Sequence, residues 1–166
     1  ICKQVRETGA DLGIIFDTDV DRSAAVTSEG KPISRNAIVA LAAAIGADDY
    51  PDGTVVTDSI TSNELHTFLE DKLGLKHLRY KRGYKNVINK AIELSKEGEN
   101  AFLAIETSGH AAYSDNYYLD DGAFLAVQTI INAANLKKEG KGIEHMIADL
   151  DEPAESVEIR FNLTAD

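Results

Sequence analysis

Strand-like and helix-like segments alternate along the middle of this chain of 166 residues, and this alternation limits the possible folds more than any other feature. Short β-branched or apolar runs are typical of strands, and the longer segments between them have helical periodicity. The expected elements are strand 54–58, helix 62–73, strand 76–80, helix 84–96, strand 102–105 and helix 121–137. Because such units connect by right-handed crossovers, the order predicts a three-layer α/β/α domain with a mostly parallel sheet.

The flanking segments predict further elements. An apolar strand at 12–16 precedes a β-hairpin, whose strands 23–27 and 31–34 flank the turn Ser28-Glu29-Gly30. Asn36 is expected to cap a helix over 37–45, and residues 142–150 can form a short helix. Alternating apolar residues over 157–163 predict a final, half-buried strand.

Charge and composition exclude several classes of function. The chain has 17 basic and 28 acidic residues and a net charge of −11, which opposes binding to nucleic acids and to anionic membranes. It has no apolar run near the roughly 18 residues of a membrane span and no signal-peptide pattern. Cys2 is the single cysteine, so an internal disulfide is impossible and a cytoplasmic location is expected.

Three aspartates directly follow the first expected strand. Asp17, Asp19 and Asp21 alternate along the chain, and Arg22 comes next. Alternate residues of a strand share one face, and a loop just after the strand can bring the carboxylates together. Oxygen ligands alone favour Mg²⁺ or Ca²⁺. An EF-hand is excluded because its sixth and twelfth positions are Arg22 and Ser28 here.

Polar segments follow two of the parallel strands, where ligands bind in such sheets. In the segment 106–110, Glu106 and Ser108 can hydrogen-bond sugar hydroxyls, and His110 can transfer protons near neutral pH. In the segment 79–85, basic residues surround Gly83 and can attract an anionic substrate. Asp120 and Asp121 precede a helix, and capping it is their expected role.

Together these segments resemble the α-D-phosphohexomutase family of phosphoglucomutases and phosphomannomutases. Residues 17–22 resemble that family's metal-binding loop, residues 106–110 its sugar-recognition loop, and residues 81–85 a glycine-containing loop of its third domain. Thr18 and Val20 stand where the family commonly has glycines, which stiffens the loop but keeps its ligands.

The resemblance implies a phosphotransferase that moves a phosphoryl group between C1 and C6 of a hexose phosphate. A phosphoserine donates this group to the sugar, and the resulting bisphosphate intermediate returns a phosphoryl group to the serine. The resemblance also implies a role for each site residue. Asp17, Asp19 and Asp21 would bind Mg²⁺, Arg22, His110 and Lys81 would act in catalysis, and Glu106, Ser108, His110, Lys81 and Lys85 would bind the substrate.

The resemblance also implies a division of the chain. Residues 1–35 would end the metal-loop domain, 36–150 would form the sugar-recognition domain, and 151–166 would lead to a further domain. We therefore expect a fragment that is inactive alone, because the serine loop and the distal phosphate-binding loop would lie in other domains of the same polypeptide.

Two alternatives remain open: a haloacid-dehalogenase-like phosphatase with Asp17 as nucleophile, and a non-catalytic module that binds sugar phosphates.

Overall fold

A four-stranded sheet forms the centre of the computed structural model, which describes residues 1–151, 153 and 157. The strand order is β5-β4-β6-β7. Strands β5 (Lys76–Tyr80), β4 (Thr54–Asp58) and β6 (Leu103–Ile105) are parallel, and β7 (Ala111–Tyr113) pairs antiparallel with β6. The prediction of a mostly parallel sheet is confirmed.

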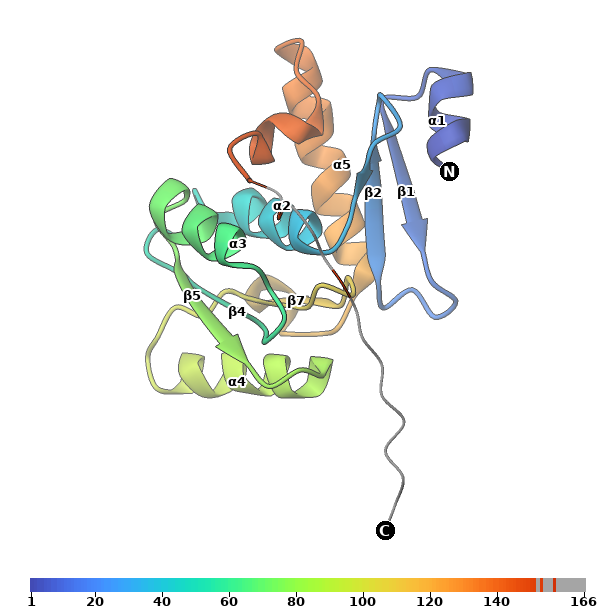
Figure 1. Cartoon of the computed structure of the whole chain (residues 1–166). Helices are drawn as coiled ribbons and strands as arrows, with labels where there is room; N and C mark the ends of the chain where they lie inside the picture. Colours follow the sequence, from blue (N-terminus) through green and yellow to red (C-terminus); the bar gives the residue numbers. More distant parts are fainter. Residues whose placement is uncertain (152, 154–156, 158–166) are drawn as a thin grey trace.

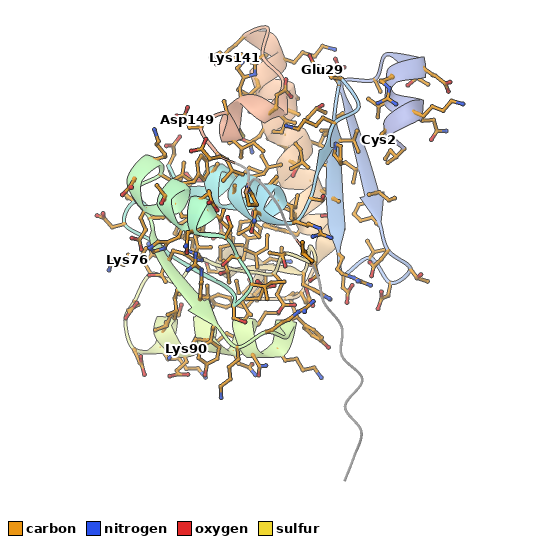
Figure 2. All side chains as sticks on the ribbon, in the orientation of Figure 1. Cys2, Glu29, Lys76, Lys90, Lys141 and Asp149 are labelled. Atoms are coloured by element: carbon orange, nitrogen blue, oxygen red, sulfur yellow. The ribbon has the colours of Figure 1, made fainter. Side chains whose placement is uncertain are left out.

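Helices cover both faces of this sheet (Figure 1). Helix α4 (Tyr84–Lys96) packs on one face, where Val56, Val87 and Ala91 are buried together. On the other face lie α2 (Asn36–Gly46), α3 (Asn63–Thr67) and α5 (Gly122–Lys138). Side chains fill the space between the layers (Figure 2). The structure is therefore the three-layer α/β/α arrangement that the alternation predicts.

Helix α2 is buried almost all around. Every residue from Val39 to Ala43 has no exposed surface, since α2 contacts the 3₁₀-helix η3 (Ile143–Ile147), α5 and α3 and shares its core with side chains of the sheet. Small side chains permit this close packing: a Cβ added to Gly46 would lie 2.5 Å from the ring of Phe102. The alanine-rich sequence of α2 thus lets the helix sit directly against its neighbours.

A second, antiparallel sheet lies beside α5, at the side of the three-layer arrangement. It contains β1 (Leu12–Phe16), β2 (Ser23–Thr27) and β3 (Pro32–Ile33), so the predicted hairpin is confirmed. Helix α5 packs against β1 and β2, and the short helix α1 (Cys2–Thr8) also contacts this sheet (Figure 1). Because Phe16 pairs with Ser23, residues 17–22 form the loop that closes the β1–β2 hairpin.

The structure differs from the sequence-based expectations in several elements. Strand β7 was not predicted. Asn36 is the first residue of α2 and not its cap, because its side-chain oxygen accepts a hydrogen bond from the Ser62 amide instead. The expected helix 62–73 is α3 followed by a π-helix, η1 (Phe68–Lys72), and the segment 142–150 contains a 3₁₀-helix, η3 (Ile143–Ile147).

The predicted strand 157–163 lies outside the described residues, apart from Val157. Of the helices that the structure describes, none has the length and apolar character required to cross a membrane.

Candidate functional site: three loops that meet at the end of the sheet

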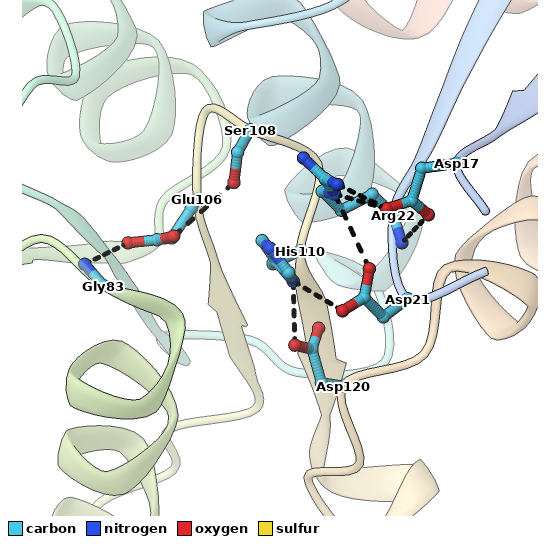
Figure 3. A network of polar contacts seen from close by, with 8 residues as sticks. All are labelled: Asp17, Asp21, Arg22, Gly83, Glu106, Ser108, His110 and Asp120. Atoms are coloured by element: carbon cyan, nitrogen blue, oxygen red, sulfur yellow. Dashed lines mark hydrogen bonds and ion pairs between the residues drawn. The ribbon is translucent and has the colours of Figure 1, made fainter. Parts of the chain in front are cut away.

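Three loops from distant parts of the sequence meet beside the carboxyl end of the parallel strands (Figure 3). We call residues 17–22 the acidic loop, residues 81–85 the basic loop and residues 106–110 the recognition loop. A backbone β-bridge joins Arg22 of the acidic loop to His110 of the recognition loop. The amide of Gly83 in the basic loop donates a hydrogen bond of 2.6 Å to Glu106. All three predicted segments therefore lie together in the fold.

The acidic loop brings its three carboxylates together. Asp17, Asp19 and Asp21 each offer an oxygen, and these oxygens all lie within 4.8 Å of one another. Asp21 Oδ1 is buried and accepts no hydrogen bond from the residues that the structure describes, although Arg22 Nε lies 3.6 Å from it as an ion-pair partner. Close carboxylates repel one another unless a cation is bound. This oxygen-only donor set fits Mg²⁺, which prefers carboxylate and water ligands.

Arg22 is held by the same carboxylates. Its guanidinium Nε and Nη2 atoms lie 2.7 and 2.5 Å from Asp17 Oδ2, and its backbone amide also donates to Asp17. Desolvation acts to raise the pKa of Asp17, but the hydrogen bonds and charge of Arg22 outweigh it, so this pKa lies below its ordinary value. Asp17 is therefore ionised at neutral pH and fixes the direction of the arginine.

Two glycines let the acidic loop pack closely on its neighbours. The amide of Gly122, the first residue of α5, donates to the Val20 carbonyl, and a Cβ there would lie 2.6 Å from the backbone of Arg22. In the recognition loop, a Cβ on Gly109 would lie 2.8 Å from the Ser23 carbonyl oxygen. Side chains at these two positions would push the loops apart.

The recognition loop is the turn of the β6–β7 hairpin. Its backbone is closed by hydrogen bonds between Glu106 and His110 and between Gly109 and Glu106. Asp58, buried at the end of β4, accepts hydrogen bonds from the Thr107 amide at 3.2 Å and from its hydroxyl at 2.9 Å. The turn is therefore anchored to the central strand of the sheet.

Glu106 and Ser108 have different environments in this loop. The Glu106 side chain is buried, and its two oxygens accept from Gly83 and, at 3.5 Å, from the Ser108 hydroxyl. Ser108 is exposed. Ser108 is thus the more accessible of the two predicted hydroxyl-binding residues, and Glu106 also joins the basic loop to the recognition loop.

His110 lies between the acidic loop and the start of α5. Its Nδ1 is 2.8 Å from Asp120 Oδ2 and 3.7 Å from Asp21 Oδ2, and the ring stacks on Tyr84 with a centroid distance of 4.8 Å. Burial raises the pKa of Asp120, while His110 opposes that rise. A hydrogen bond from Nδ1 to Asp120 leaves Nε2 to accept or release a proton.

The two predicted lysines stay at the surface. Lys81 and Lys85 are exposed, and Lys85 Nζ lies 5.7 Å from the centre of the Tyr84 ring. No hydrogen bond or ion pair joins either lysine to the described part of the chain. Among the described residues, neither lysine side chain is therefore hydrogen-bonded or ion-paired to the acidic or recognition loop.

Three residues of this region were not assigned to the site from the sequence: Asp58, Tyr84 and Asp120. Asp121 caps α5 by accepting from the Phe124 amide, so the expected capping role belongs to it, whereas Asp120 binds His110. Tyr84 stacks on His110, and Asp58 holds Thr107. Asp58 could have been found from the sequence, because it is an aspartate at the end of an expected buried strand. For Tyr84 the sequence offered only its position within the basic segment.

Comparison with known proteins adds independent information. The profile of the family described as "Phosphoglucomutase/phosphomannomutase, alpha/beta/alpha domain III" matches residues 34–152. A phosphoglucosamine mutase of Synechocystis is 29% identical over 153 residues, which is 91% of this chain and 30% of that protein. The chain thus spans about a third of the length of such relatives.

Solved structures are similar as well. A phosphoglucomutase/phosphomannomutase family protein of Burkholderia thailandensis is 25% identical, with a TM-score of 0.76, over 92% of this chain and 31% of that one. The N-acetylphosphoglucosamine mutase of Aspergillus fumigatus, solved with GlcNAc-6P and magnesium, has the same fold, at 17% identity and a TM-score of 0.58, over 84% of this chain and 35% of that one. By the match over residues 34–152, the chain belongs to the phosphoglucomutase/phosphomannomutase family.

Proposed function

We propose that this chain is part of a phosphohexomutase that moves a phosphoryl group between C1 and C6 of a hexose phosphate. A phosphoserine from another domain of the same polypeptide would donate the group, and a bisphosphate intermediate would form. The observation that carries the proposal is the contact between the acidic loop and the recognition loop, made by the Arg22–His110 bridge. Family membership favours this reaction over the phosphatase and the non-catalytic module.

Asp17, Asp19 and Asp21 are proposed as the Mg²⁺ ligands. Their converging oxygens support this assignment, and so does Asp21 Oδ1, which is buried and accepts no hydrogen bond from the described residues. So does the magnesium named with the related Aspergillus fumigatus enzyme. When bound, Mg²⁺ would neutralise negative charge on the transferring phosphoryl group.

Arg22 is proposed to pair with oxygens of the transferring phosphoryl group. Its side chain is 44% exposed although Asp17 holds it, so part of the guanidinium can face a ligand. A planar guanidinium that is already oriented loses little freedom when it binds a phosphate.

The remaining residues are proposed to bind the sugar and to move protons. Glu106 and Ser108 would bind hydroxyls, Lys81 and Lys85 would attract the phosphate, and His110 would exchange a proton with the reacting hydroxyl. The stacking of Tyr84 and the hydrogen bond to Asp120 support His110 in that role, because they fix the direction of its ring.

The experiment is the Asp19→Asn variant of a full-length protein that contains this chain. We expect kcat with glucose 1-phosphate to fall by roughly 10²–10⁴-fold at saturating Mg²⁺, since a metal ion contributes several kcal/mol of transition-state stabilisation. A thermal melt checks that the fold is intact. Unchanged turnover would refute the metal assignment. Asp11→Asn, at an exposed carboxylate paired with Lys137, is the control and should leave kcat unchanged.

A further inference from the structure

A pocket of about 380 Å³ opens beside the recognition loop, between the start of α2 and the basic loop. The residues that line it are two arginines, three residues with hydroxyl or amide groups, and two aliphatic residues: Arg35, Arg82, Asn36, Thr107, Ser108, Ile60 and Val157. None of these is acidic. Although the chain has a net charge of −11, two arginines and no carboxylate among these residues give the pocket a local positive charge that attracts anions.

The charges of Arg35 and Arg82 are uncompensated within the described part of the chain. No hydrogen bond or ion pair involves either guanidinium there, whereas Arg22 is paired with Asp17. The acidic side chain of the recognition loop does not compensate them, because Glu106 is buried and accepts from Gly83 and Ser108. Both arginines are exposed and available to a ligand.

The backbone at Arg35 supports a functional role for this residue. Its φ of 55° and ψ of −124° lie in a region that side chains other than glycine rarely adopt. Such strain costs about 1–3 kcal/mol and occurs often at binding sites. Arg35 makes no side-chain cap hydrogen bond to α2, so capping does not explain the conformation. The strained backbone places an unpaired arginine in the pocket.

Neutral groups complete a set of hydrogen-bond donors. The Asn36 side-chain oxygen accepts from the Ser62 amide, which leaves its NH₂ group to donate. The exposed Ser108 hydroxyl lines the same pocket. Guanidinium groups bind phosphate through paired hydrogen bonds, and hydroxyl and amide donors can satisfy its remaining oxygens.

We propose that this pocket binds the phosphate group of a phosphorylated ligand through Arg35 and Arg82. This inference rests on the proposed function for the identity of the ligand. The ligand would be the hexose phosphate whose hydroxyl groups bind Ser108. This chain would then contribute to phosphate recognition together with the other domains of the polypeptide.

The test is an NMR titration of the ¹⁵N-labelled 166-residue chain without Mg²⁺, with inorganic phosphate, glucose 6-phosphate and glucose as probes. We expect the two phosphates to shift the amide signals of Arg35, Arg82 and Ser108, and glucose to leave them unchanged. Arg35→Gln and Arg82→Gln should each raise the phosphate Kd by roughly tenfold, since each removes a charge-assisted hydrogen bond. Lys76→Gln, at the opposite end of β5 from the basic loop, is the control and should not change Kd (Figure 2).

Equal phosphate affinity in the wild type and both variants would overturn the inference, as would shifts confined to the acidic loop. The amide spectrum of each variant reports whether it folds, and Arg82→Lys, which keeps the charge, should recover part of the affinity. Phosphate binding at the pocket without turnover in the full-length protein would refute the proposed function alone. Turnover with wild-type KM in both glutamine variants would refute the pocket alone.

Discussion

At the scale of single residues, the acidic loop contains a backbone conformation that its sequence does not favour. Val20 has a φ of 65°, in the left-handed region, where a β-branched side chain is an outlier. It stands between Asp19 and Asp21, and its carbonyl accepts from the amide of Gly122. The loop therefore keeps its carboxylates together at some cost in stability.

Replacing Val20 with glycine should relieve this strain. We expect Val20→Gly to raise the free energy of unfolding by about 0.5–1 kcal/mol, because left-handed backbone costs roughly 1–2 kcal/mol and glycine entropy offsets part of the gain. Urea denaturation of the chain measures the change. Thr18→Gly is the matched control: Thr18 has no positive φ, so this variant should be less stable than the wild type. A loss of stability in Val20→Gly would contradict the account.

His77 lies in a polar cluster away from the candidate site. Its Nε2 is 2.7 Å from Thr57 Oγ1 and its Nδ1 is 3.1 Å from His66 Nδ1, while its amide donates to Glu70. Burial, with smaller contributions from the charges of Arg79 and His66, lowers the pKa of His77 to about 4. The folded state therefore favours neutral His77.

This shift predicts how stability depends on pH. Between pH 6.5 and about 4 the unfolded chain binds a proton at His77 that the folded chain does not, so stability falls as pH falls through this window. We expect His77 to contribute about 1–2 kcal/mol of this loss, after allowing for solvent screening at a partly exposed ring. Urea denaturation at several pH values should show a shallower slope in His77→Gln. An unchanged slope in His77→Gln would refute the assignment.

The sequence predicted candidate site residues where they lie together in one short segment. Asp17, Asp19 and Asp21 alternate directly after a strand, so their convergence could be predicted. Asp120, which precedes α5, and Tyr84, the first residue of α4, come from distant segments and meet at His110. Such contacts depend on tertiary structure, which no spacing rule describes.

At the scale of elements, the amino end of α5 supports the acidic loop. Gly122→Ala should displace this loop, because the new Cβ would lie within 2.8 Å of three backbone atoms of Arg22. We expect a loss of about 1–3 kcal/mol in stability, as in overpacked cores, and roughly tenfold weaker Mg²⁺ binding. Urea denaturation and NMR titration with Mg²⁺ measure both. Ala123→Gly, one residue along on the exposed side of α5, should lower stability by helix propensity alone. Unaltered Mg²⁺ affinity in Gly122→Ala would show that α5 does not position the loop.

Elements with strong local patterns had the predicted bounds, and elements that depend on tertiary contacts did not. Strands 54–58 and 76–80 and helix 84–96 coincide with β4, β5 and α4. Strand β7 is Ala111–Tyr113, too short and too rich in alanine for a strand pattern, and it exists because it pairs with β6. The π-helix η1 forms where the Leu73 amide donates to the Phe68 carbonyl, within a segment whose periodicity is helical.

At the scale of the whole molecule, the division into domains remains a proposal. We propose that residues 1–35 end a metal-loop domain, that 36–150 form the sugar-recognition domain, and that 151–166 lead to a further domain. The family profile matches residues 34–152, and the acidic loop precedes this range although it packs against it. The site would thus lie between two domains, which suits a substrate that must turn over within a cleft.

The most direct test of the proposed mutase reaction is a ³¹P NMR time course of glucose 1-phosphate with the full-length protein, Mg²⁺ and a trace of glucose 1,6-bisphosphate. We predict that the C1 phosphate signal is replaced by a C6 phosphate signal without release of inorganic phosphate, and that the 166-residue chain alone gives no product. Accumulation of inorganic phosphate, sensitive to Asp17→Asn, would instead indicate the phosphatase. Turnover by the purified 166-residue chain would contradict the need for a phosphoserine from another domain.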